Sequence, residues 1–192
     1  MKQLFLYSVL FILSAIPTSG VVDETVPSDN LTDPITISSL SSAVRDHLIY
    51  LSLQAHFELP DFLISAVNTG IELTFIVDIE VLNNRKVLPN KKFIDLQWRK
   101  KLHFYALTQH YVVEDLSFNQ QANFNSLENA LAFLGHYDNV PVIEQTLLAS
   151  SQATNMRVRI KLSRADLPVL LRLKSYVLYP QPLSSNWYQW SL

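Results

Sequence analysis

Alternating apolar and polar positions are the main pattern in the chain. In residues 71–82, every second residue from Ile71 to Val81 is apolar, and the polar positions between them include Glu72, Asp78 and Glu80. Successive side chains of a β-strand point to opposite faces of a sheet. The segment is therefore predicted to be a strand with one face in a core and the other toward water.

Similar alternation predicts further strands. They span residues 35–37, 47–59, 94–106, 111–116, 157–162, 173–179 and 186–192. Residues 108–110 are expected to turn the chain between two strands of a hairpin. Lys100 interrupts the apolar face of the 94–106 strand, and Arg157, Arg159 and Lys161 occupy the polar face of the 157–162 strand.

Two segments have the apolar spacing of short helices. Residues 60–70 begin near Pro60, and residues 126–134 follow Ser126, which is a suitable N-cap, and precede Gly135. A further helical turn is expected at 163–171, and Pro141 is expected in a loop. Strands outnumber helices, which predicts a mainly β fold, an antiparallel β-sandwich or curved sheet with two or three short helices, with α+β as the alternative.

The N-terminus has the order of a secretory signal peptide. Lys2 precedes an apolar run of 13 residues, Leu4 to Ile16, and small residues follow it up to Gly20. A membrane-spanning helix needs about 20 apolar residues. We expect residues 1–20 to be a signal peptide cleaved at Gly20, residues 21–33 to be a flexible segment, and residues 34–192 to form one domain with no membrane span. An uncleaved N-terminal anchor is the alternative.

The charges lie in blocks of one sign. Between Asp23 and Glu80 there are ten acids and one base, and between Arg85 and Lys101 there are seven bases and one acid. Opposite charges suit neighbouring strands, so Glu72, Asp78 and Glu80 are expected to pair with Arg99 and Lys101 or with the bases of residues 157–161. A basic patch for an anionic ligand is the alternative. Without residues 1–20 the formal charge is −3, which argues against a nucleic-acid partner.

Familiar catalytic motifs are missing from the sequence. Three glycines cannot build a phosphate-binding loop, and the absence of cysteine excludes disulfides and thiolate chemistry. The five histidines have no metal-binding spacing, so neither a metal site nor a cofactor is expected. A hydrolase assembled from dispersed His, Asp, Glu and Ser residues stays open as an alternative.

Aromatic residues close the chain. In a terminal strand, Trp187 would point outward with Gln189, while Tyr188 and Trp190 would point inward. Together with Trp98 they form a candidate interaction surface, which could bind a glycan, an apolar ligand or a protein. The simpler interpretation is that these rings cap the core.

Several blocks of residues resemble an uncharacterised proteobacterial family catalogued as domain of unknown function forty-three-ninety. The resemblance is carried by Trp98-Arg99, Leu102, Tyr105, Leu107-Thr108, Tyr111, Phe124-Asn125-Ser126-Leu127, Ala130-Leu131, Leu167-Pro168, Ser185-Asn186-Trp187 and Trp190. It implies export in Gram-negative bacteria, hence the periplasm, with no established activity and no assigned catalytic residues. In some relatives the gene lies beside a sensor kinase and its response regulator.

The chain departs from this family pattern at two places. Arg85 to Pro89 stand where relatives have a tryptophan-rich stretch, and Val169, Leu170 and Leu171 follow Leu167-Pro168 where relatives have polar or proline residues. The leading functional hypothesis is a non-catalytic periplasmic domain that binds a protein partner in the cell envelope, with a link to a sensor kinase. The alternatives are a binder of a glycan or apolar ligand and a hydrolase. The oligomeric state is left open.

Overall fold

The computed structural model describes residues 33–83, 91–151 and 155–191. All of them belong to one unit, Leu31–Leu192. The predicted signal peptide, its cleavage point at Gly20 and residues 21–32 lie outside the described residues.

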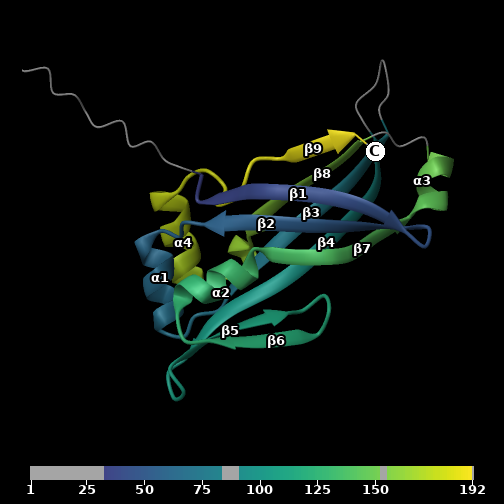
Figure 1. Ribbon diagram of the computed structural model, residues 1–192. Coiled ribbons are helices and arrows are strands. Elements are labelled where there is room, and N and C mark those ends of the chain that lie inside the picture. The colour runs from purple at the N-terminus through teal and green to yellow at the C-terminus, as the bar shows by residue number, and fades with distance from the viewer. Residues whose placement is uncertain (1–32, 84–90, 152–154, 192) are drawn as a thin grey trace, which may run out of the picture. The chain divides into compact units, whose positions relative to one another are not determined.

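The described strands form two antiparallel sheets (Figure 1). Sheet A has the order β1-β2-β7, made of β1 (Ile35–Arg45), β2 (Leu48–Phe57) and β7 (His136–Glu144). Sheet B has the order β6-β5-β4-β3-β8-β9, made of β6 (Gln120–Phe124), β5 (His110–Asp115), β4 (Lys91–Tyr105), β3 (Leu73–Asn83), β8 (Asn155–Leu162) and β9 (Tyr188–Ser191). The prediction of a mainly β, antiparallel fold is confirmed.

Short helices connect the strands. They are α1 (Asp61–Asn68), α2 (Leu127–Leu134), α3 (Gln145–Ser151) and α4 (Val169–Leu178), with a 3-10 turn η1 at Arg164–Asp166. The predicted helices at 60–70 and 126–134 are confirmed as α1 and α2, and Ser126 caps α2 by accepting a hydrogen bond from Asn129 N. The strand predicted at 173–179 is wrong, because these residues belong largely to α4.

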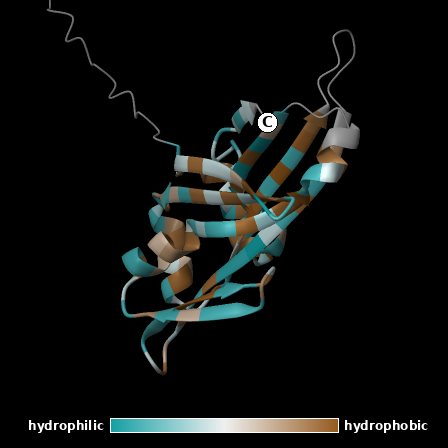
Figure 2. Ribbon diagram, turned by 45° about the vertical axis from the view of Figure 1, so that its right-hand side comes forward, coloured by the Kyte–Doolittle hydropathy of each residue, from teal (hydrophilic) through white to brown (hydrophobic). Residues whose placement is uncertain are grey.

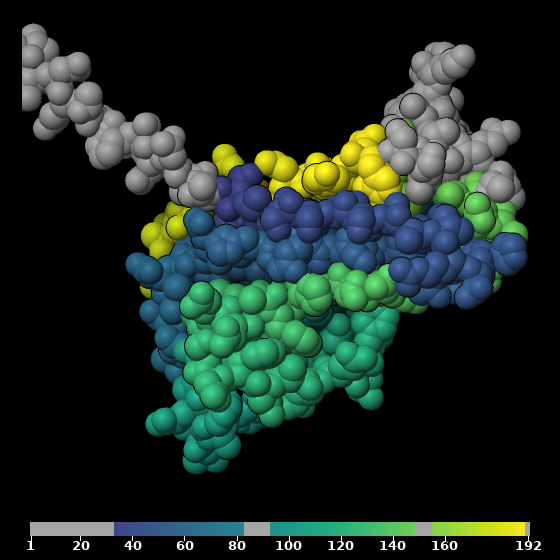
Figure 3. All heavy atoms as spheres, viewed as in Figure 1, coloured from purple at the N-terminus to yellow at the C-terminus, as the bar shows by residue number. Residues whose placement is uncertain are grey.

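The core lies between the two sheets. Leu51, Leu53 and Phe57 of β2 are buried in the same cluster as Phe75 and Val77 of β3. The rings of Phe57 and Phe75 meet edge to face, 5.2 Å apart. Figure 2 shows the banded hydropathy along the strands that this packing requires, and Figure 3 shows the side chains of sheet A and α2 covering the sandwich on the viewer's side.

Both faces of β3 are buried, which corrects the prediction that one face meets water. Asp78 and Glu80 on its outer face are each only 3% exposed, and Thr74 and Ile76 beside them are also buried. The reason is the central place of β3 between β4 and β8. Long side chains of both neighbours reach the acids on its outer face.

Bases of β8 neutralise the two buried carboxylates. Arg157 Nε lies 2.6 Å from Glu80 Oε2, and Asp78 Oδ2 accepts hydrogen bonds from Arg159 Nε (3.1 Å) and Lys161 Nζ (2.6 Å). Burial alone would raise the pKa of Asp78, but the hydrogen bonds and charges of Lys161 and Arg159 outweigh it and lower that pKa. The predicted pairing of oppositely charged strands is thus confirmed.

The prediction of a loop around Pro141 is wrong, because Pro141 lies within β7. β7 is an edge strand of sheet A, where a proline removes no ladder hydrogen bond that the sheet needs, and the register with β2 shifts next to Pro141. The chain enters β7 through Gly135, whose carbonyl accepts a hydrogen bond from Ala55 N (2.9 Å). A Cβ at Gly135 would lie 2.2 Å from Ala55 O, so only glycine allows this close approach.

Replacing Asp78 with Asn should destabilise the fold by about 3 kcal/mol, because Arg159 and Lys161 would lose their shared carboxylate. Chemical denaturation at neutral pH measures this loss. The matched control is Glu72→Gln, which removes the exposed partner of Lys101 and should change stability by less than about 1 kcal/mol. Equal losses in the two variants would contradict the role given to the buried pairs.

Replacing Gly135 with Ala should lower the free energy of unfolding by about 3 kcal/mol, because the new Cβ meets backbone atoms that cannot rotate away. Gly70→Ala is the control. Gly70 has a φ of +87°, but a Cβ there would lie 3.8 Å from Phe104 O, an ordinary contact distance, so its replacement should cost only about 1 kcal/mol. A smaller effect at Gly135 than at Gly70 would show that the contact with β2 is loose.

Candidate docking surface

α4 packs on the domain through one narrow side. Pro168 precedes the helix, and Ser175 on its inner side is fully buried, with its hydroxyl donating to Arg172 O (2.7 Å). Just after the helix, the ring of Tyr179 lies 5.7 Å from that of Phe62 in α1. Figure 1 shows α4 beside α1 at one end of the sheets.

The opposite side of α4 is apolar and exposed. Leu170 and Val177 are 82% and 77% exposed, and the other large apolar side chains exposed on this helix are Val169, Leu173, Tyr176 and Leu178. At 3.6 residues per turn, all of these except Leu178 fall within an arc of about 120°. We call this stripe the α4 face, defined by Val169, Leu170, Leu173, Tyr176 and Val177.

Basic residues border the α4 face. Arg172 and Lys174 lie at its two edges, and Arg164 of η1 holds its guanidinium 4.7 Å from the ring centroid of Tyr176. Nη2 of Arg172 donates to Ala165 O (2.6 Å) and Leu167 O (2.9 Å), so this charge is fixed in place. The surface is therefore an apolar stripe with a positive rim.

No helix within residues 33–83, 91–151 and 155–191 is both long and apolar enough to cross a membrane. Single exposed apolar residues are normal on protein surfaces, whereas a contiguous stripe rimmed by polar groups is typical of an interaction site. The five exposed residues of the α4 face form a stripe of this kind.

Among the aromatic residues predicted to form an interaction surface, Trp98 is separated from the three near the C-terminus, because β3 and β8 lie between β4 and β9. Trp98 is 3% exposed and stacks on Tyr137, with the ring centroids 5.5 Å apart, so it belongs to the core and not to a surface. Trp187 is half-buried, with its ring 4.2 Å from the Arg157 guanidinium and 4.4 Å from that of Arg159.

Tyr188 and Trp190 face the same side of β9, opposite Val158 and Met156 of β8. Trp190 packs against the core, while Tyr188 stays 44% exposed because β9 is the edge strand of sheet B. The candidate surface at the C-terminus thus consists of the exposed Tyr188 and the half-buried Trp187.

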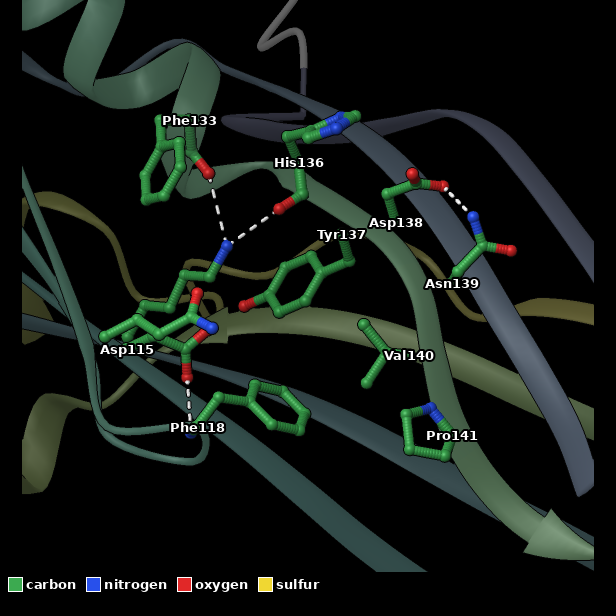
Figure 4. A pocket seen from close by; sticks show the side chains of 11 residues that line it. Asp115, Phe118, Phe133, His136, Tyr137, Asp138, Asn139, Val140 and Pro141 are labelled. Atoms are coloured by element: carbon green, nitrogen blue, oxygen red, sulfur yellow. Dashed lines mark hydrogen bonds between the residues drawn. The ribbon is translucent and has the colours of Figure 1, made fainter.

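A pocket of about 280 Å³ lies between sheet A and the β5–β6 hairpin (Figure 4). It is lined by Lys100, Asp115 and Tyr137, among others. Lys100 is the residue that interrupts the apolar face of β4, and it is 3% exposed. Burial lowers the pKa of Lys100 to about 8, despite the opposing charge of Asp115.

A lysine with such a pKa can act as a base or a nucleophile if its amine is free. Here Nζ donates to Phe133 O (3.2 Å) and His136 O (2.8 Å) and lies 3.7 Å from the ring centroid of Tyr137. Phe133 O lies in the last turn of α2, where it also accepts a hydrogen bond from a backbone N–H at the C-cap. Lys100 therefore ties β4 to the end of α2 and the start of β7, which is a structural role.

The other polar groups near this pocket also pair locally. His136 Nδ1 lies 2.8 Å from Gln54 Oε1, and Ser52 Oγ donates to Asp138 Oδ1 (3.1 Å), so no serine is paired with a histidine there. Among the residues that the structure describes, no group of three or more His, Asp or Glu is placed to hold a metal ion.

Lys100→Met should change how stability depends on pH. The wild-type lysine has a pKa of about 8 when folded and an ordinary value of 10.5 when unfolded. Between pH 8 and pH 10.5, Lys100 is therefore protonated in the unfolded chain and deprotonated in the folded protein. The free energy of unfolding of the wild type should therefore rise, relative to the variant, by up to about 3 kcal/mol from pH 8 to 10.5. Denaturation at several pH values tests this, and a constant difference would contradict it.

The chain matches a family model described as Domain of unknown function (DUF4390), over residues 32–191. No curated protein and no solved structure matches it. The matched residues include every strand and helix described above, with α4 and the Lys100 pocket among them. The chain therefore belongs to the DUF4390 family.

Proposed function

We propose that the protein is a non-catalytic exported domain that binds a protein partner in the cell envelope, and that it does so through the α4 face. The observation that carries the proposal is the exposure of five large apolar side chains along one stripe of one helix. An amphipathic helix whose apolar side is open fits into an apolar groove of another protein, with anchors spaced like Leu170, Leu173 and Val177. Export, to the periplasm, is supported by the apolar run Leu4 to Ile16 after Lys2.

The charges around the α4 face indicate which charge the partner surface should carry. Arg172 and Lys174 border the stripe, and Asp166 is the one acid in residues 155–191. A second copy docked through the same face would bring these bases toward their own equivalents, which opposes dimerisation. A partner groove rimmed by carboxylates would instead be attracted. The proposed partner is therefore a different protein with an apolar groove and an acidic border.

The two alternatives find less support. A glycan binder needs several exposed aromatic rings, yet Trp98 is buried and Trp187 lies against Arg157 and Arg159. Of the four aromatic residues of the candidate surface, Tyr188 alone is exposed. A hydrolase needs a free nucleophile or carboxylates that converge, and the amine of Lys100 is held by two carbonyl groups. An apolar stripe with a positive rim favours protein docking over both.

Site-specific photo-cross-linking in intact cells tests the docking. A photoreactive phenylalanine analogue placed at Leu170 or Val177 should capture one envelope protein. The same analogue at Leu107, which is 98% exposed at the β4–β5 turn, is the matched control and should not capture it. Leu170→Asp should reduce co-purification of that protein at least tenfold, while Leu107→Asp should leave it unchanged.

Two outcomes would overturn the proposal. One is capture of the same proteins from Leu107 and from the α4 positions, which would indicate random collision. The other is unchanged co-purification in Leu170→Asp. Both aspartate variants should keep the wild-type unfolding midpoint, because each replaces an exposed side chain. A loss of binding therefore reports the contact and not the fold.

A further inference from the structure

An open groove of about 390 Å³ lies next to the α4 face, on the outer side of sheet B. Arg159 and Lys161 of β8 form one wall, and Arg164 of η1 and Tyr176 of α4 form another. Ile76 and Leu183 supply apolar lining. Three basic side chains thus converge on one groove, and no carboxylate lines it.

The positive charge of this groove is only partly compensated. Arg159 and Lys161 share a single carboxylate, that of Asp78, whose other oxygen accepts a hydrogen bond from Gln97 Nε2 (2.8 Å). Arg164 has no carboxylate within 4.0 Å among residues 33–83, 91–151 and 155–191. Three cations therefore face one anion, which leaves an excess of two positive charges.

Arg164 is held in a fixed orientation beside the groove. Its Nη2 donates to Tyr179 O (2.6 Å) and to Gln181 O, and its guanidinium lies against the ring of Tyr176. Its Nε is buried and has no hydrogen-bond partner in the described part of the chain. The guanidinium of Arg164 is therefore held in place by carbonyl groups and an aromatic ring, without a carboxylate partner among the described residues.

We propose that this groove binds a phosphate group, either free or carried on an apolar chain. A phosphate has a charge of about −1.5 to −2 at neutral pH, which matches the excess. Arginine and lysine are the charged side chains that bind phosphate in proteins, and Ser163 and Ser184 are also among the residues that line the groove. An apolar chain would lie on Ile76, Tyr176 and Leu183. The site does not depend on a protein docked to α4.

Titration calorimetry of the purified protein tests the site with two probes, inorganic phosphate and hexyl phosphate, against chloride at equal ionic strength. Lys161→Met should weaken phosphate binding at least tenfold, and Lys161→Arg should restore it. The control is Lys101→Met, which removes a base of the same sheet that pairs with Glu72 outside the groove, and it should bind like the wild type.

The two probes distinguish the sources of the phosphate. Tighter binding of hexyl phosphate indicates a phosphate on an apolar chain, such as a lipid headgroup, and equal binding indicates free phosphate. The proposal is overturned if phosphate binds no better than chloride, or if Lys161→Met and Lys101→Met lose the same affinity. It is also overturned if Lys161→Arg, which keeps the charge, binds as weakly as Lys161→Met.

Discussion

The burial of Asp78 and Glu80 in the middle of sheet B is the constraint on which the arrangement of this sheet depends. A carboxylate taken out of water must be paired and hydrogen-bonded. The register of β3 with β8 sets Asp78 opposite Arg159 and Glu80 opposite Arg157. A slip of one residue would turn the bases of β8 toward the apolar core. The charges therefore fix the register, and with it the start of the segment that carries η1 and α4.

The strands with regular alternation could be predicted from the sequence, but their surroundings could not. The period of two in residues 71–82 identifies a strand and its core face. It does not reveal that β3 is a central strand. Acids at alternate positions, like those on the outer face of β3, also occur in strands whose outer face meets water. The long bases of β8, distant in sequence, cover that face together with Gln97 of β4. The opposite charge of the two segments was the one sequence signal of this contact.

The elements that escaped prediction have weak or conflicting patterns. β7 contains Pro141, which indicates a loop unless the strand is known to lie at an edge. In and after α4, Leu171, Leu173, Val177 and Tyr179 fall at alternate positions as in a strand, while Leu170, Leu173 and Val177 have helical spacing. The segment forms a helix, and Pro168 is a suitable residue for its N-terminal end. The apolar side that such a helix normally buries stays exposed here, so the exposed α4 face could not be predicted from its pattern.

The exposure of the α4 face has no explanation in folding itself. α4 is anchored by Ser175 and by the contact of Tyr179 with Phe62, and polar residues at Leu170 or Val177 would leave these contacts intact. Exposed apolar residues contribute little to the stability of a folded chain and promote association. Arg172 and Lys174 at the edges of the stripe oppose association with like surfaces. Together these features agree with the proposed contact with an apolar and acidic surface, and the like charges oppose indiscriminate self-association.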